Sequence, residues 1–147
     1  MPQHQAKLKR TLVGQLPHGA DLYESLTKIA KNEDIKLGRV LAIGATTHAV
    51  VAFYDHTQKK YVNMEFPGSM EILTCNGNVS LREGKPFVHV HIVLGDRLGK
   101  VFGGHLMPGT KVFACEVFID EFEGEELRRD YDEFTGLYLW GRGNQLV

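Results

Sequence analysis

The sequence contains little cysteine and no long hydrophobic run. Its two cysteines, Cys75 and Cys115, are far apart and form no CxxC pair, which excludes a disulfide framework and is typical of a reducing compartment. The longest apolar run, Ala49 to Tyr54, is much shorter than the roughly 20 residues of a membrane span. The N-terminal residues also lack the apolar segment of a secretory signal. We therefore expect a cytoplasmic protein without a membrane partner.

An excess of charge of one sign is lacking as well. The net charge is −1, whereas a stand-alone nucleic-acid-binding domain is strongly basic. Residues 1–40 carry seven Lys or Arg against four Asp or Glu, and residues 121–147 carry three against seven. Two solvated surfaces, or complementary faces within an oligomer, explain this asymmetry better than a DNA-binding arm. The sequence also has no P-loop lysine followed by Ser or Thr, so it does not support a nucleotide site. It contains neither a GxSxG elbow nor an HExxH helix.

The sequence does have the composition of one soluble domain. It has 147 residues, of which 43% are hydrophobic and 24% charged. A strand is predicted over residues 8–14, and a helix over residues 21–32, because Asp21 can cap it and Glu24 stands three residues later. The apolar stripe of this helix consists of Leu22, Leu26 and Ile29.

Strands dominate the rest of the chain, where β-branched and aromatic runs are separated by glycines. These runs cover residues 40–43, 46–54, 61–66, 70–76, 87–94, 101–102 and 112–122. Only one long helical pattern accompanies them, which excludes alternating βαβ units. The expected fold class is therefore α+β: a single compact domain with a curved, mostly antiparallel β-sheet and one main helix at about residues 21–32.

The most informative segment is the strand of residues 87–94, which contains two histidines. Strand alternation places His89 and His91 on one face, and their Cβ atoms are then within about 7 Å, close enough to share one ion. The glycine-bounded turn of residues 95–99 predicts a hairpin whose returning strand sets His105 opposite Val90 or His91. We expect Gly103 and Gly104 to form a bulge that aims His105. The opposite face of the strand is predicted to be core and consists of Val88, Val90, Ile92 and Leu94.

Three histidines at one place favour a bound divalent metal. A single histidine on a half-exposed sheet face is usually a polar surface residue, but clustered imidazoles repel one another when protonated. Zinc is the first candidate, because neutral imidazole suits it. Without a fourth protein ligand the metal keeps an open position, where a bound water ionises near neutral pH. Metal-assisted hydrolysis or hydration is then available, and the sequence leaves open whether the chain is an enzyme and which substrate it takes.

On these motifs the sequence resembles the plants-and-prokaryotes-conserved (PPC) domain family, and the match runs from about Lys7 to Trp140. The motifs that carry it are GRVLAIG (38–44), EILTCNGN (71–78), GKPFVHVHIVLGD (84–96), GGHL (103–106) and RDYDEFTGL (129–137). The resemblance implies a domain at residues 7–140, between a flexible N-terminal tail (1–6) and a C-terminal tail (141–147). It further implies a homotrimer, and in prokaryotic members a metal held by the histidines that match His89, His91 and His105.

The family's association with DNA is weaker in this sequence. Plant members join the domain to AT-hook motifs, short basic segments around Arg-Gly-Arg-Pro that lie in the minor groove. This chain offers only Gly141-Arg142-Gly143, without the second arginine and the proline. A DNA-binding or transcription-regulatory protein that lacks an AT-hook therefore stays the alternative to a metal-binding protein.

Overall fold

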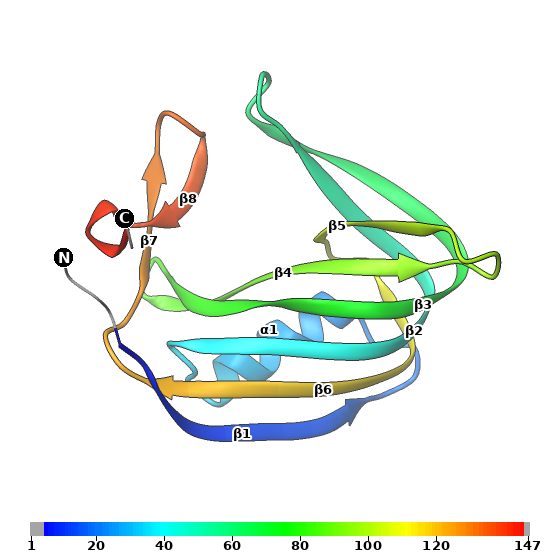
Figure 1. The fold of residues 1–147 in the computed structure, drawn as a ribbon, viewed down its shortest axis with the longest axis horizontal. Coiled ribbons are helices and arrows are strands. Elements are labelled where there is room, and N and C mark those ends of the chain that lie inside the picture. The colour runs from blue at the N-terminus through cyan, green and yellow to red at the C-terminus, as the bar shows by residue number, and fades with distance from the viewer. Residues whose placement is uncertain (1–4, 146–147) are drawn as a thin grey trace.

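A long curved sheet and one α-helix make up the computed structural model, which describes residues 5–145 (Figure 1). The elements are β1 (Lys7–Leu16), α1 (Leu22–Asn32), β2 (Gly38–Asp55), β3 (Lys60–Arg82), β4 (Lys85–Gly95), β5 (Val101–Leu106), β6 (Lys111–Glu123), β7 (Arg128–Asp132), β8 (Leu137–Trp140) and the 3-10 helix Arg142–Asn144. Residues 1–4 and 146–147, which belong to the two expected tails, lie outside the described residues. The α+β class with one main helix is confirmed.

The helix begins and ends where the sequence predicts. The Asp21 side chain accepts a hydrogen bond from the Glu24 backbone N–H at 3.1 Å and so caps the first turn. Leu22, Leu26 and Ala30 are fully buried along its inner stripe, and Ile29 packs against the core at the edge of that stripe. In Figure 1 the helix covers one face of the sheet, which leaves the other face open.

The sheet has the strand order β1-β6-β2-β5-β4-β3-β7-β8, with a further pairing between β2 and β3. All pairings among residues 5–145 are antiparallel except that of β3 with β7. Because β5 pairs with β4 on one edge and with β2 on the other, strands β2, β3, β4 and β5 form a closed ring of pairings. This closure produces the predicted curvature of the sheet.

Several predicted strands are parts of longer ones. Residues 40–43 and 46–54 both lie in β2, and residues 61–66 and 70–76 both lie in β3. The glycines between these runs do not end the strands, because the chain passes them through register shifts such as the one between Ala42 and Gly44. Strands β7 and β8 were not predicted, since the charged sequence of β7 has no apolar alternation.

The core lies between the helix and the covered face of the sheet. The predicted inner face of β4 is fully buried, with Val88, Val90, Ile92 and Leu94 no more than 1% exposed. Cys75 and Cys115 are buried free cysteines, and burial raises the pKa of the Cys75 thiol to about 12 and that of Cys115 to about 11. Within residues 5–145, the one α-helix is too short and too polar to span a membrane.

Candidate metal centre

The three predicted histidines come together on the sheet face opposite the core side of β4. His89 and His91 project from the same face of β4, as strand alternation requires, since the residues between and beside them are buried on the other face. The hairpin after β4 has the predicted register and sets His105 of β5 directly across from His91. The ring centroids are 5.2 Å apart for His89 and His91, 5.1 Å for His89 and His105, and 5.6 Å for His91 and His105.

The two glycines before His105 do not form the expected bulge. The pairing of β4 with β5 continues without a shift through Ile92↔Gly104 and Val93↔Gly103. Steric crowding explains Gly104 instead, because a Cβ on Gly104 would lie 2.8 Å from the carbonyl oxygen of Ala52 on β2. Glycine therefore lets β5 lie tightly between β4 and β2, and this close packing fixes the position of His105.

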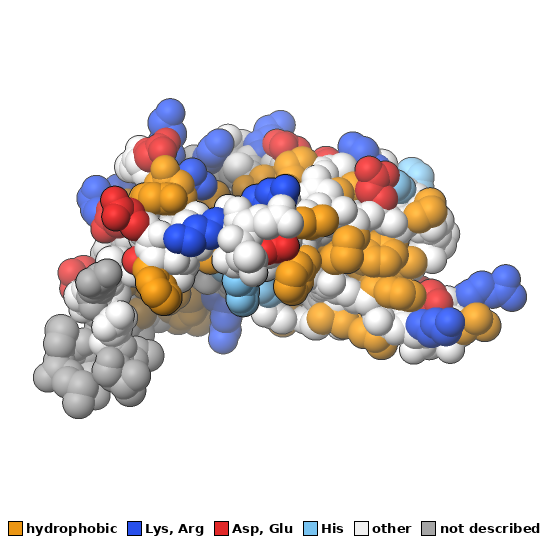
Figure 2. Space-filling view, turned by 90° about the horizontal axis from the view of Figure 1, so that it is seen from above, with side chains coloured by type: hydrophobic (Ala, Val, Ile, Leu, Met, Phe, Trp, Pro, Cys, Tyr) orange, Lys and Arg blue, Asp and Glu red, His pale blue; other side chains and the backbone are white. Residues whose placement is uncertain are grey.

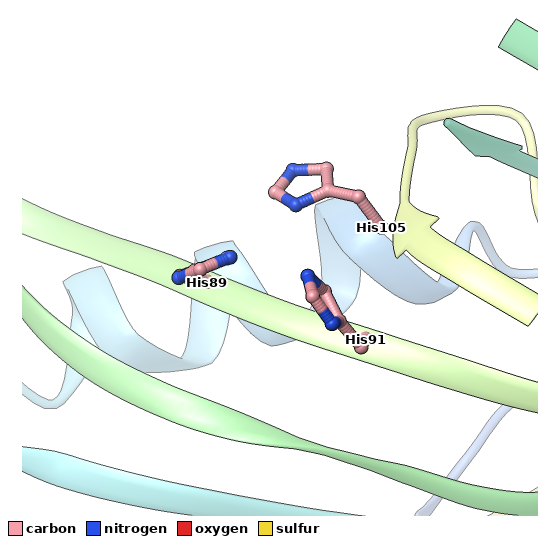
Figure 3. A group of neighbouring side chains, drawn as sticks. All are labelled: His89, His91 and His105. Carbon is pink, nitrogen blue, oxygen red and sulfur yellow. The ribbon is translucent and has the colours of Figure 1, made fainter. Parts of the chain in front are cut away.

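The ring nitrogens form a set suited to one metal ion. Figure 3 shows each imidazole turning a nitrogen toward the space between the three rings. One ligand nitrogen from each histidine lies within 4.8 Å of the others. The Nδ1 atom of His105 is buried and has no hydrogen-bond partner within the described residues. A buried ring nitrogen without a partner is costly, and a metal bound at this nitrogen would remove that cost.

The surroundings keep two of these rings neutral. Burial is the main cause that lowers the pKa of His89 to about 4, and the positive charge of Arg129 lowers it further. Burial likewise lowers the pKa of His105 to about 4, with His91 as the next cause. Both rings are therefore unprotonated at neutral pH, which is the form that binds a metal.

Arg129, from β7, lies beside His89 and is not identified as a site residue by the sequence. Its Nη2 lies 3.5 Å from Nδ1 of His89 and donates a 2.8 Å hydrogen bond to Oδ1 of Asn78. The side chain is 8% exposed. The parallel pairing of β7 with β3 brings it there, at Arg82↔Arg129. The sequence feature that could have drawn attention to Arg129 is its position as the first residue of the RDYDEFTGL motif.

Asp96 of the hairpin turn and the histidines His18 and His48 make contacts elsewhere in the fold. The Asp96 carboxylate accepts hydrogen bonds from the backbone N–H groups of Leu98 and Lys100, at 2.8 and 2.9 Å, and so shapes the turn between β4 and β5. His18 contacts the Phe113 carbonyl oxygen at 2.9 Å, and His48 lies beside Glu65 on the β2–β3 pair. Neither belongs to the three-histidine group.

The fold and the site define a class of protein: a small, curved-sheet α+β domain with three histidines gathered on its open face. The sequence signature of the Plants and Prokaryotes Conserved (PCC) domain, also abbreviated PPC, matches residues 3–123. This range covers α1, strands β1 to β6 and all three histidines. The chain belongs to the Plants and Prokaryotes Conserved domain family.

Similar solved structures cover nearly the whole chain. A metal-containing protein from Archaeoglobus fulgidus is 39% identical, with a TM-score of 0.89 over 97% of this chain and 100% of that one. A PPC protein from Pyrococcus horikoshii is 34% identical, with a TM-score of 0.90 over 97% of this chain and 98% of that one. A candidate DNA-binding protein from Ralstonia eutropha is 26% identical, with a TM-score of 0.78 over 88% of this chain and 89% of that one.

Among curated proteins, the bifunctional protein GlmU from Synechococcus is 28% identical over 120 residues. The match covers 80% of this chain but only 18% of that protein.

Proposed function

We propose that this chain binds a divalent metal ion, zinc in the first place, through His89, His91 and His105. The observation that carries this proposal is the convergence of three imidazole nitrogens within 4.8 Å, one of them buried without a partner. Two nitrogens on a tetrahedral zinc lie roughly 3.3 Å apart, given Zn–N distances of about 2.0 Å. The rings therefore move closer together on binding. The similar Archaeoglobus fulgidus protein is described as metal-containing.

The three-histidine set leaves room for chemistry at the metal. Three protein ligands keep one position open, and catalytic zinc sites have this arrangement while structural sites have four protein ligands. When bound, the metal would supply an acidic water or polarise a ligand oxygen there. Metal-assisted hydrolysis or the binding of a small ligand is the function that this site supports best.

Metal content tests the proposal directly. The purified chain is stripped with EDTA, reloaded with Zn²⁺ and measured by elemental mass spectrometry, and we expect zinc stoichiometric with the chain. A His89→Ala, His91→Ala double variant should lose it, while His48→Ala, which removes a histidine outside the group, should keep it. Equal zinc in the double variant and the wild type would refute the site.

Activity is tested separately from binding. Ester, amide and phosphate substrates are screened with the zinc-loaded protein, and any activity found should disappear with a chelator and return with Zn²⁺. His105→Ala should abolish it while the circular dichroism spectrum stays unchanged. A zinc-loaded protein that is inert across the panel supports small-ligand binding over hydrolysis.

We also propose that the chain assembles as a homotrimer in the cytoplasm. The sheet face away from the helix exposes large apolar side chains that lie side by side: Phe118 of β6 pairs with Val13 of β1 and with Leu41 of β2, and their exposed fractions are 47%, 66% and 48%. Hydrophobic side chains also form a broad patch in the right half of Figure 2. Surfaces of this kind favour self-association. The free thiols of Cys75 and Cys115 suit a reducing compartment.

Light scattering after size-exclusion chromatography tests the assembly. The wild type should have a mass about three times the 16.5 kDa of the chain. Leu41→Lys should shift this mass downward, whereas Leu98→Lys, which changes an equally apolar residue in the β4–β5 turn, should not. A wild-type monomer at micromolar concentration would contradict the trimer.

DNA binding is the second candidate, and the Ralstonia eutropha protein is the observation in its favour. The basic cluster of Lys7, Lys9 and Arg10 is poorly suited to it, because Lys9 and Arg10 form salt bridges with Glu121. We expect at most nonspecific binding that disappears by physiological ionic strength. Nanomolar binding to one duplex sequence at about 0.15 M salt, lost on changing these three residues to alanine, would establish the DNA function.

A further inference from the structure

A cavity opens beside the histidines, and all of its charged lining side chains are positive. Its volume is about 430 Å³, within the range of small-molecule sites, and both His89 and His105 contribute to its wall. Its charged lining side chains are Lys59, Lys60, Arg82 and Arg129, and none of the lining residues is Asp or Glu. Its aromatic lining side chains are Tyr23, Tyr54, Tyr61, Phe87 and Tyr138.

Arg129 is a buried cation whose hydrogen-bond partners among the described residues are all neutral. Its guanidinium donates hydrogen bonds to the Ser80 hydroxyl at 2.8 Å, the Asn78 side-chain oxygen at 2.8 Å and the Tyr138 carbonyl oxygen at 3.1 Å. It forms no salt bridge with an Asp or Glu of residues 5–145. A buried charge normally has a counter-charge. Burial lowers the pKa of Arg129, in agreement with a positive charge held away from water.

Arg82 adds a second guanidinium at the same place. Its Cζ lies 3.6 Å from the ring centroid of Tyr138 and 5.5 Å from that of Phe87, while the Cζ of Arg129 lies 5.3 Å from the Phe87 centroid. Both cations therefore lie near the same aromatic ring, that of Phe87. Arg82 likewise has no salt bridge within the described part of the chain. Cation–π contacts reduce the cost of each charge, but they leave the guanidinium N–H groups of Arg82 available for an acceptor.

We propose that this cavity binds a small organic anion, with its oxyanion group on Arg82 and Arg129 and its apolar or aromatic body against the tyrosines and Phe87. Guanidinium groups bind carboxylate and phosphate oxygens with paired hydrogen bonds, so both head groups share the required chemistry. The proposal goes beyond the metal site and does not depend on it, because the four cations belong to the protein itself. A ligand in this cavity would also border His89 and His105, where the proposed metal binds.

Isothermal titration calorimetry with benzoate, phenyl phosphate and the neutral benzamide tests the proposal on the full chain, in EDTA-treated and zinc-loaded form. We expect at least one of the two anions to bind, and benzamide to bind about tenfold more weakly or not at all. Benzoate reports a carboxylate site and phenyl phosphate a phosphate site. Arg82→Gln should weaken anion binding by about tenfold or more.

Arg128→Gln is the matched control, since it removes the same charge from a neighbouring β7 residue that is exposed and paired with Glu126. It should leave anion binding unchanged. Because Arg129→Gln can disturb the fold through its three hydrogen bonds, Arg82→Gln carries the test, with thermal melting to show that it is folded. The zinc content of Arg82→Gln should equal that of the wild type.

These results separate the two proposals. Anion binding by the wild type that persists without zinc supports the cavity even if the metal site fails. Zinc binding without any anion binding, in either form of the protein, overturns the cavity and leaves the metal site standing. Benzamide binding as tightly as the tighter of the two anions, or equal loss in Arg82→Gln and Arg128→Gln, also overturns it.

Discussion

Replacement of Thr110 by valine tests how the position of His105 is maintained. Thr110 is fully buried between β5 and β6, and its hydroxyl accepts the backbone N–H of Val50 at 3.0 Å and donates to the Val50 carbonyl at 3.0 Å. Valine keeps the shape but removes every hydrogen bond of the hydroxyl. The Val50 carbonyl retains the Met107 N–H at 3.1 Å, whereas the Val50 N–H loses its partner and the Met107 carbonyl loses a longer, 3.4 Å hydrogen bond from the Thr110 hydroxyl.

An unpaired buried N–H costs ~1–3 kcal/mol. In a domain of this size such a loss lowers Tm by roughly 2–12 °C. Urea unfolding at pH 7 should therefore show a lower midpoint with an unchanged m value, while Thr110→Ser, which keeps the hydroxyl, should remain near the wild type. Since Val51 and Ala52 pair with Leu106 and His105 next to this contact, zinc affinity should also fall. A Thr110→Val protein with the wild-type midpoint would refute this account.

Three further predictions concern other positions in the sheet. Gly77→Ala would place a Cβ onto the carbonyl oxygen of His89 in the neighbouring strand, so we expect about 1–3 kcal/mol of destabilisation in urea titrations together with weaker zinc binding. Cys75 should resist iodoacetamide at pH 7 in the folded protein and react after unfolding, because burial raises its pKa to about 12. The hydrogen bond from Lys9 lowers the pKa of Glu121 in the folded protein. Ionised Glu121 therefore contributes its full stabilisation above pH ~4.3, the pKa of Glu in the unfolded chain, and this stabilisation is lost as the pH falls through the lower pKa of the folded protein. Glu121→Gln should flatten this acid-side loss of urea stability.

The histidine group could be predicted because every step to it is local in sequence. Alternation along one strand places His89 and His91 on one face, and the turn of residues 95–99 sets the register that brings His105 opposite. The apolar residues of β4 fix which face is buried, so a shift of one residue would put valines in water. The role of Gly104 was predicted wrongly, since the neighbour that requires a glycine is β2, and the sequence does not reveal that β5 also pairs there.

Arg129 could not be assigned to the site from the sequence for a different reason. Its place depends on a parallel pairing of β7 with β3, between segments almost fifty residues apart. The charged sequence of β7 has no periodic pattern that identifies it as a strand. Its closeness to Phe87 and His89 is a consequence of the whole topology, and only the three-dimensional arrangement shows that two arginines border one cavity.

The proposed metal would serve function more than stability. A zinc ion that holds a small fold together has four protein ligands and compensates for a core that is too small, but here 24 buried hydrophobic residues within residues 5–145 form the core without the histidines. His91 is exposed, and the group lies on the face away from that core. His89 and His105 also line the cationic cavity. An anion held by Arg82 in this cavity would lie beside the histidines that would hold the metal, so the two features together can orient one ligand that neither would hold as selectively alone.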